Sequence, residues 1–399
     1  MESAKEHIVI RGCGAISPLG IDEQSTAQAY FSGRPGFSIV QHQGQATPVA
    51  ALSEAGEEAL QKLQAETPTY RQLDRSVLMA IYAARQAAEQ AGWLNAPSEP
   101  QQDLAVNIGS SRGATGLFEQ HYEAFQQQRL SASASPTTTL GNLSSWVGHA
   151  VNAGGAQISH SITCSTALMA VANGIAWLRA GMASRFLAGG TEAPLTDFTI
   201  AQMKAIGIYS SMHDQPFPCQ PYGISGENTF VLGEGAAVLA LEKVTASQLR
   251  KGDVIIEAVG FGFEQIQSKT GISADGLNFQ QSMRHALSQL ESPANKIDAI
   301  ITHSPGTKAG DKAELSAIEA IFKSNPPAIT TNKHLLGHTL GASGALSLQY
   351  ALHLLDQQKI TLPDYPLLLP PSPLAGMQRL MINAAGFGGN AASITLCIV

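Results

Sequence analysis

The sequence predicts an α/β fold, in which strands and helices alternate along one large domain or two closely packed domains. A chain of 399 residues is long enough to bury a sizeable core. Hydrophobic residues make up 44% of it and charged residues 14%, a composition typical of compact proteins rather than disordered ones. Short apolar runs that end in small-residue turns alternate with segments of helical periodicity. This alternation is typical of crossover units on a parallel sheet.

In the first half of the chain, apolar runs that end in turns predict strands, and longer segments with apolar residues at helical spacing predict helices. The predicted strands cover residues 7–14, 104–108, 157–162 and 186–188, and the predicted helices cover 75–91 and 166–180. Glycines close the first and last of these strands.

The second half begins as the first does, with an apolar run at 253–262 that closes on a Gly-x-Gly turn like that of 7–14. This similarity suggests an internal duplication. The further predicted elements are helices at 279–290, 312–322 and 344–355, a strand at 297–301 and terminal strands.

Three stretches lack this order. Residues 41–69 and 126–139 are rich in Gln, Ala, Glu, Ser and Thr, and we interpret them as surface insertions. Residues 361–375 contain five prolines, which predicts an extended strap.

Composition and charge exclude several classes of function. The formal net charge is -7 and no basic stripe is present, so we expect no nucleic acid partner. The N-terminal residues 1–7 are charged and lack the apolar stretch of a signal peptide, and no apolar run could span a bilayer. We therefore expect a cytoplasmic protein without a membrane partner. Its cysteines, Cys13, Cys164, Cys219 and Cys397, form no C-x-x-C pair, which argues against zinc and against a disulfide framework.

Cys164 lies where a predicted strand passes through a turn of small hydroxyl residues into an apolar helix. A helix N-terminus favours the nucleophilic thiolate, and its free amides can hold an oxyanion. The alternative interpretation is a buried structural cysteine. From the residues around Cys164 alone, the two interpretations are about equally good.

Two histidines stand in comparable places. His303 follows the predicted strand 297–301, and His338 lies in a glycine-rich turn before the helix 344–355. Functional groups of α/β sheets collect at the carboxyl ends of strands. A single histidine is more often structural, and most of the 11 histidines are expected to be so.

Six segments, in order along nearly the whole chain, resemble the β-ketoacyl-acyl-carrier-protein synthases, which are condensing enzymes of the thiolase superfamily. They include Thr163-Cys164-Ser165-Thr166-Ala167 and the histidine motifs, and they cover residues 10–20, 163–167, 230–237, 302–307, 333–344 and 383–390. The resemblance implies a thiolase-like fold of two duplicated α/β halves in a layered αβαβα arrangement. Residues 1–248 would carry the nucleophile and residues 249–399 the two histidines.

The resemblance also implies the reaction and the partners. Cys164 would take an acyl group from acyl carrier protein, and malonyl-carrier protein would lose CO₂ and attack it. His303 and His338, as neutral imidazoles, would stabilise the enolate. No cofactor is implied, because the substrates are carried on the phosphopantetheine of acyl carrier protein. The chain would form a homodimer, or a heterodimer with a chain-length-factor-like homologue.

Supporting residues carry over by position in the same resemblance. Glu314 and Lys333 match a buried acidic and basic set that orients the histidines. Phe387 matches the residue whose amide completes the oxyanion hole with that of Cys164 and whose ring gates the acyl pocket, and Gly388 follows it. Thr307 matches a threonine that contacts the pantetheine.

The sequence departs from the family pattern at two places. Pro305 replaces the first of two pantetheine-contacting threonines, and residues 221–228 lack the charged residues often found before the Gly-Glu-Gly motif. Both changes favour a specialised fatty-acid, polyene or polyketide pathway.

The main alternative function is a non-catalytic chain-length-factor-type subunit or scaffold partner of an active ketosynthase. The presence of Cys164, His303, His338 and Lys333 argues against it. A degradative thiolase would need a second cysteine in a glycine-rich motif, which Cys397 lacks. A cysteine hydrolase or a ligand-binding module has no matching motif.

Overall fold

The computed structural model describes residues 6–94, 99–266, 271–291, 297–323, 325–369 and 376–399. The first five residues of the charged N-terminal segment lie outside this part. Among the described residues, no helix is long and apolar enough to cross a membrane. Nor does this part of the chain bring together three or more His, Cys, Asp or Glu side chains that could hold a metal ion.

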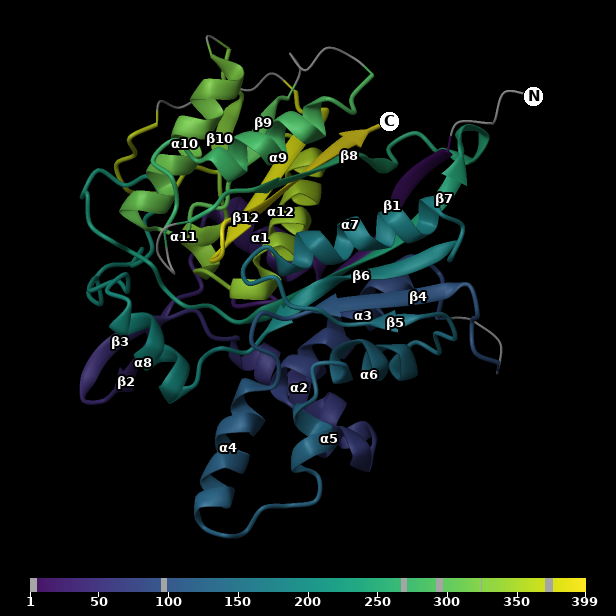
Figure 1. The fold of residues 1–399 in the computed structure, drawn as a ribbon, viewed down its shortest axis with the longest axis vertical. Helices are drawn as coiled ribbons and strands as arrows, with labels where there is room; N and C mark the ends of the chain where they lie inside the picture. The colour runs from purple at the N-terminus through teal and green to yellow at the C-terminus, as the bar shows by residue number, and fades with distance from the viewer. Residues whose placement is uncertain (1–5, 95–98, 267–270, 292–296, 324, 370–375) are drawn as a thin grey trace.

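One mixed sheet of ten strands runs through the molecule (Figure 1), in the order β10-β9-β11-β12-β8-β1-β7-β6-β4-β5. The strands of the first half are β1 (Glu6–Ile16), β4 (Leu104–Gly109), β5 (Gln157–Ile158), β6 (Arg185–Glu192) and β7 (Gly235–Thr245). Those of the second half are β8 (Val254–Phe263), β9 (Ala299–Ile301), β10 (Ala328–Thr330), β11 (Arg379–Gly386) and β12 (Asn390–Ile398). A short antiparallel pairing of β1 with β8 joins the two sets.

The two sets of strands have the same topology. Counted along the chain, each set has the spatial order third, second, fourth, fifth, first. In each set the second strand pairs parallel with the third and the fourth, whereas the other pairs are antiparallel. The sheet is therefore mixed and not the purely parallel sheet that the alternation of strands and helices predicted.

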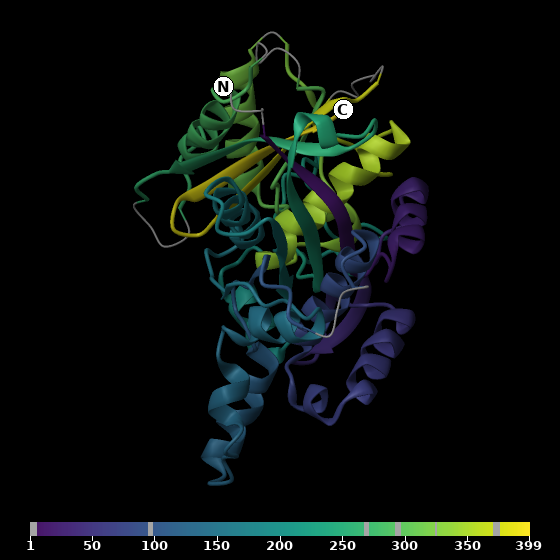
Figure 2. The same cartoon turned by 90° about the vertical axis from the view of Figure 1, so that its right-hand side faces the viewer.

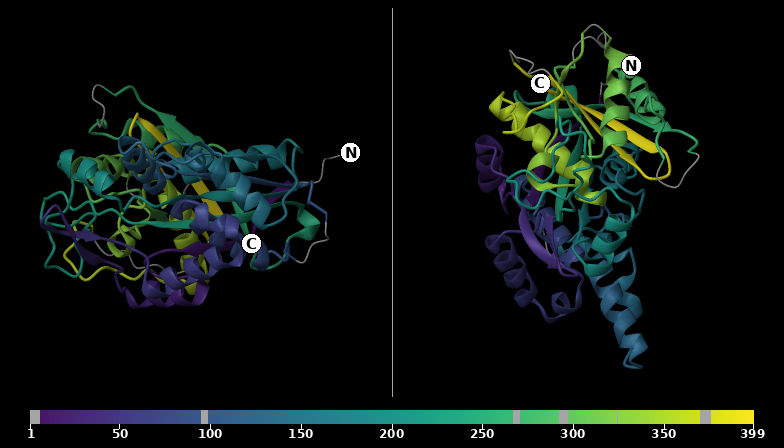
Figure 3. Two further views of the ribbon diagram at one scale, coloured as in Figure 1. Left: turned by 90° about the horizontal axis from the view of Figure 1, so that it is seen from below. Right: turned by 90° about the vertical axis from the view of Figure 1, so that its left-hand side faces the viewer.

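Helices form three layers around these strands (Figures 1 and 3). Helices α7 (Thr166–Arg179) and α12 (Ser343–Gln357) share a hydrophobic core with strands of both sets, so they lie between them. Helices α3 (Arg75–Gln90) and α6 (Asn142–Ala150) cover the other face of the first set. Helices α9 (Leu277–Leu287) and α10 (Lys308–Phe322) cover that of the second. This is the predicted αβαβα arrangement, and the described structure confirms the α/β class.

The glycine pairs that suggested a duplication have a physical cause. A Cβ atom on Gly14 would lie 2.0 Å from the carbonyl oxygen of Ala83 in α3. A Cβ atom on Gly262 would lie 1.9 Å from that of Asn278 in α9. In both halves, glycine on the first strand lets an outer helix lie directly against the sheet.

The two stretches interpreted as surface insertions contain regular elements that were not predicted. Residues 41–69 overlap the hairpin β2 (Ser38–His42) and β3 (Gln45–Val49) and contain α2 (Glu54–Glu66). Residues 126–139 contain α5 (Ala134–Thr138), which follows the projecting helix α4 (Thr115–Gln126) seen in Figure 2. In α2 the buried face has only a few apolar residues, such as Leu60 and Leu63, among many polar ones, so composition concealed it.

Two other predicted segments also differ from the observed structure. Strand β5 has two residues rather than the predicted six, because residues 159–165 form the turn before α7. The proline-rich strap has no helix or regular strand in residues 361–369, and Leu367 bridges to Gly223. The rest of that predicted strap, 370–375, lies outside the described residues.

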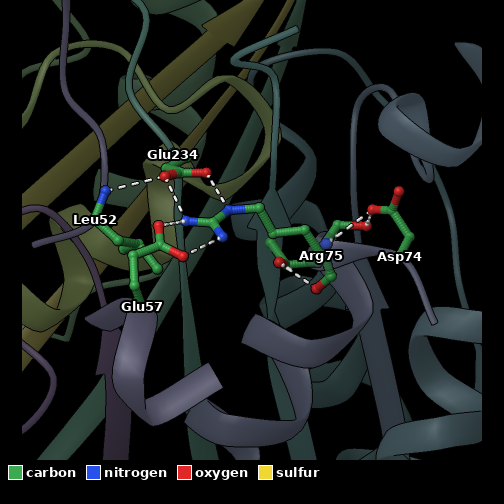
Figure 4. A network of polar contacts seen from close by, with 7 residues as sticks. Leu52, Glu57, Asp74, Arg75 and Glu234 are labelled. Atoms are coloured by element: carbon green, nitrogen blue, oxygen red, sulfur yellow. Dashed lines mark hydrogen bonds and ion pairs between the residues drawn. The ribbon is translucent and has the colours of Figure 1, made fainter. Parts of the chain in front are cut away.

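Glu234, the glutamate of the Gly-Glu-Gly segment, accepts hydrogen bonds from residues of several segments (Figure 4). Glu234 accepts hydrogen bonds from Arg75 Nε at 2.7 Å and from the Leu52 amide at 3.0 Å, and Arg75 also pairs with Glu57 of α2. Burial opposes the charge of Arg75, but its two carboxylate partners raise its pKa above the usual value. Glu234 thus has a structural role.

Candidate active site

Cys164 lies in a rigid turn at the start of α7. Thr166 is the first residue of that helix, and its Oγ1 donates to the carbonyl of Thr163 at 2.6 Å and accepts from the amide of Ile162 at 2.8 Å. Thr163 has the unusual φ of 49°. The prediction that Cys164 would stand at or just before a helix N-terminus is therefore confirmed.

The second half of the chain touches this turn through the end of β11. A Cβ atom on Gly386 would lie 1.8 Å from Thr163 Oγ1 and 3.0 Å from the amide nitrogen of Cys164. The carbonyl of the next residue, Phe387, accepts hydrogen bonds from Thr163 Oγ1 and from Asn390 Nδ2, both at 3.2 Å. Only glycine at 386 permits this close approach.

His303 follows β9 and is fixed through its backbone. The carboxylate of Glu314, which is fully buried on α10, accepts hydrogen bonds from the amides of His303 at 3.0 Å and Ser304 at 2.9 Å. It also accepts one from Asn383 Nδ2 at 3.1 Å. Glu314 therefore holds the turn that carries His303 rather than the imidazole itself.

His338 lies in the segment between β10 and α12, beyond the short helix α11 (Lys333–Leu336). Its amide donates to the carbonyl of Val231 at 2.7 Å. The ring centroids of His303 and His338 are 5.0 Å apart, and the rings are nearly perpendicular at 84°. The two imidazoles therefore stand side by side although 35 positions separate them in the sequence.

A cavity of about 360 Å³ joins the predicted residues. Cys164, His303, His338, Thr307 and Phe387 all line it. Glu314 and Lys333 are buried, at 0% and 1% exposure, outside its lining. Gly388 does not line the cavity, although its neighbours Phe387 and Gly389 do.

The rest of the cavity wall is mostly apolar around Cys164. Next to Cys164, apolar side chains of α8 (Asp197–Ala205) and of neighbouring segments form a hydrophobic cluster. Among those that also line the cavity are Met203, Phe230 and Leu340. Pro305, Lys308 and Gly310 stand at another part of the wall. The site thus has an apolar region suited to a hydrocarbon chain.

Burial raises the pKa of the Cys164 thiol to about 12, and the charge of Glu192 acts in the same direction. The cations Lys333 and Arg112 oppose this rise. The helix N-terminus led us to expect a favoured thiolate, but the effect of burial on the pKa of Cys164 outweighs it. Cys164 is therefore a thiol at neutral pH.

Both histidines of the site are neutral at pH 7. Burial, followed by the charge of Lys333, lowers the pKa of His303 to about 3. Burial, His303 and Lys333 together hold the pKa of His338 well below its ordinary value. Within the described structure, neither Nδ1 atom has a hydrogen-bond partner. Each neutral ring carries one N–H donor and one acceptor nitrogen.

Two further ionisable side chains, Lys333 and Asp311, are buried near the cavity. Burial lowers the pKa of Lys333 to about 8, against the opposing effect of Glu314. Asp311 accepts hydrogen bonds from the amides of Gly306 at 3.1 Å and Thr307 at 3.2 Å, and burial raises its pKa to about 7. Asp311 therefore holds the loop in which Pro305 departs from the family pattern.

Glu192 is a buried acidic residue near Cys164 that was not predicted from the sequence. Glu192 ends β6, has no exposed surface, and acts on the pKa of Cys164. Its position at the end of an apolar strand, just after Gly189 and Gly190, was the available signal.

Known proteins share both the sequence pattern and this fold. The family model of the N-terminal domain of β-ketoacyl synthases matches residues 5–246, and that of the C-terminal domain matches residues 255–363. An α/β fold with a cysteine and two histidines in one cavity agrees with an enzyme that transfers acyl groups. The chain belongs to the β-ketoacyl synthase family.

Curated relatives match nearly the whole chain. It is 27% identical to 3-oxoacyl-[acyl-carrier-protein] synthase 2 of Coxiella burnetii, over 98% of both chains. It is 26% identical to the protein of the same name from Staphylococcus aureus strain COL, over 97% of both.

Solved structures share the fold at lower identity. The ishigamide ketosynthase/chain length factor matches with a TM-score of 0.85 and 23% identity over 99% of this chain and all of that one. A ketosynthase in complex with its chain length factor from Xenorhabdus doucetiae matches with a TM-score of 0.81 and 22% identity, over 99% of this chain and 98% of that one.

Proposed function

We propose that this chain catalyses a decarboxylative Claisen condensation between an acyl group on Cys164 and malonyl-acyl carrier protein. One observation carries the proposal: a single cavity is lined by Cys164 from the first half and by the neutral His303 and His338 from the second. The apolar side chains beside the thiol suit an acyl chain.

In the first step, the sulfur of Cys164 attacks the carbonyl carbon of an acyl thioester. The new carbon–sulfur bond forms while the bond to the pantetheine sulfur breaks, and the proton of Cys164 leaves with the pantetheine as its thiol. The amides of Cys164 and Phe387 are the proposed donors to the oxyanion, and the close packing of Gly386 on the Cys164 turn supports this assignment.

In the second step, the malonyl group loses CO₂ and its electron pair forms an enolate. Neutral His303 and His338 can each donate one hydrogen bond to the enolate oxygen without giving up a proton. The enolate carbon then attacks the acyl carbonyl, and Cys164 leaves as a thiolate that takes a proton from water. Glu314 supports His303 through two backbone amides, and Lys333 is the proposed buried cation of this set.

Acyl carrier protein is the proposed partner, with Thr307 and Gly388 at the pantetheine entrance. The solved structures described above include ketosynthases together with a chain length factor. We propose that this chain likewise forms a homodimer or pairs with such a homologue, in the cytoplasm and without a further cofactor. The division into residues 1–248 and 249–399 is supported by the repeated strand order. Pro305 favours a specialised pathway.

Mass spectrometry tests the proposal. The chain is incubated with a long-chain acyl-carrier protein, and the peptide that contains Cys164 is weighed. We expect one acyl group on Cys164 and none in Cys164→Ala. Cys219→Ala is the matched control, because Cys219 is also buried but does not line the cavity. A wild-type chain that stays unmodified would contradict the proposed function.

A further inference from the structure

The buried carboxylate of Glu192 accepts five hydrogen bonds. One oxygen, Oε1, accepts from Ser110 Oγ at 2.7 Å and from the amide of Arg112 at 3.1 Å. The other, Oε2, accepts from the amide and the hydroxyl of Ser111 at 2.8 and 2.5 Å, and from the amide of Gly341 at 2.8 Å. Burial raises the pKa of the Glu192 carboxyl above its ordinary value, and the three backbone amides and two hydroxyls that converge on it oppose this rise because they favour the ionised form.

The donors come from both halves of the chain. Residues 110–112 form the turn after β4, whereas Gly341 lies three residues after His338 in the segment that leads into α12. Through Glu192, the end of β6 is therefore bonded to the turn that carries one of the two site histidines.

The same junction contacts the helix that follows Cys164, and it is packed without free space. A Cβ atom on Gly190 would lie 2.8 Å from the carbonyl oxygen of Gly341 and 2.9 Å from Cβ of Ala167 in α7. A Cβ atom on Gly341 would lie 2.5 Å from the amide nitrogen of Ser111. A shift of the Glu192 carboxylate must therefore move the His338 turn relative to the Cys164 helix.

We propose that Glu192 is a positioning residue for the condensation: its carboxylate fixes the turn after His338 against the helix after Cys164. This inference rests on the proposed function for its catalytic consequence. Glu314 does the comparable work for His303, since it accepts from two consecutive amides there.

The charge of Glu192 has a second consequence, on the thiol. In the described structure, no Lys or Arg forms an ion pair with Glu192. The charged groups that act on Cys164 are Glu192 from β6, Lys333 from α11 and Arg112 from the turn after β4, with His303 and His338 neutral. Removal of the Glu192 charge leaves two cations to favour the thiolate.

The test compares Glu192→Gln, Glu192→Asp and wild type by two measurements on the full chain. The first is the rate of Cys164 alkylation by iodoacetamide as a function of pH, followed by the mass of the Cys164 peptide. We expect the midpoint of Glu192→Gln to fall by about one pH unit, because a like charge is lost, and that of Glu192→Asp to stay near wild type. The second is CO₂ release from malonyl-carrier protein, where we expect kcat to fall about tenfold in Glu192→Gln with KM unchanged, and less in Glu192→Asp.

Glu234→Gln is the matched control, because Glu234 is also a buried, hydrogen-bonded carboxylate but is absent from the charges that act on Cys164. We expect it to lower the melting temperature and leave the alkylation midpoint unchanged. A Glu192→Gln chain that behaves as Glu234→Gln does in both measurements overturns the proposal. If wild type releases no CO₂, the proposed function fails, and the alkylation midpoint still decides whether the Glu192 charge acts on Cys164.

Discussion

In the first half of the chain the turn after the third strand, β5, carries Cys164; in the second half the turn after the third strand, β10, carries His338. The turns after the second strands correspond as well: residues 110–112 follow β4, and His303 follows β9. In both, a buried carboxylate accepts from two consecutive amides, Glu192 in the first half and Glu314 in the second.

The two halves share this backbone support but carry different ionisable side chains in the turns that it holds. The first half presents one thiol beside an unpaired carboxylate, which helps to keep it protonated. The second half presents two imidazoles near Lys333, which helps to keep them neutral. The comparison teaches that one backbone arrangement can hold the proposed nucleophile or the proposed hydrogen-bond donors, depending on the side chains in its turns. It also divides the proposed reaction: acyl transfer in the first half and decarboxylation in the second.

Cys164→Ala is expected to separate condensation from CO₂ release most clearly. Condensation should fall by at least about a thousandfold, because the acyl group has no attachment point. CO₂ release from malonyl-carrier protein should persist, since both histidines remain. Product mass and CO₂ release measured on the same sample check this. Loss of both activities in a folded variant would break the division.

The reverse separation is expected for His303→Asn and His338→Asn. CO₂ release should fall by about 10²–10³-fold, because a donor to the developing enolate is displaced. Acylation of Cys164, followed by intact mass, should continue. His353→Asn is the control, since His353 packs against Tyr30 and Tyr350 away from the cavity. Variants that cannot be acylated would show that the halves do not act separately.

The contact between the halves can be perturbed at Gly386. The added methyl of Gly386→Ala would collide with Thr163 Oγ1, so we expect a loss of about 1–3 kcal/mol in the free energy of unfolding and slower acylation. Urea unfolding and Cys164 acylation rates measure both effects. Gly141→Ala is the control, because its Cβ would meet open space and its φ is not positive. Equal stability of the two variants would contradict the packing argument.

The smallest effect concerns pH. The folded pKa of His303, about 3, lies below the ordinary histidine pKa of 6.5, so the unfolded chain binds the proton first as pH falls. The stability contributed by neutral His303 is complete above pH 6.5 and is lost towards pH 3, at about 1.4 kcal/mol per pH unit. Urea unfolding between pH 7 and 5 should show a shallower loss in His303→Asn than in wild type. Parallel curves would show that His303 is not held neutral.

Much of the fold followed from periodicity, because long buried elements carry a strong pattern. Helices α3, α7 and α12 were predicted within a few residues of their observed ends. Helix α2 was missed, since its apolar stripe is narrow and its composition polar. Parallel and antiparallel pairing depends on contacts between distant segments, so the mixed sheet did not follow from local patterns.

Some residues of the site were predicted and others were not, because only some of them lie in a distinctive local sequence. Cys164, His303 and His338 lie in turns with distinctive neighbours, and the described structure brings all three to one cavity. Glu192 has no such local motif, and its importance arises from donors that lie 80 residues before it and 149 residues after it. The raised pKa of Cys164 depends on burial among side chains of several segments, which the helix-terminus argument did not include.

The most direct test of the central claim is the product of one turnover. The chain is first acylated, then given malonyl-carrier protein, and the thioester on the carrier protein is weighed. The proposed function predicts a β-ketoacyl group that contains the original acyl chain plus two carbons, together with release of one CO₂ and free Cys164. A chain that retains its acyl group on Cys164 while malonyl-carrier protein remains intact would contradict it.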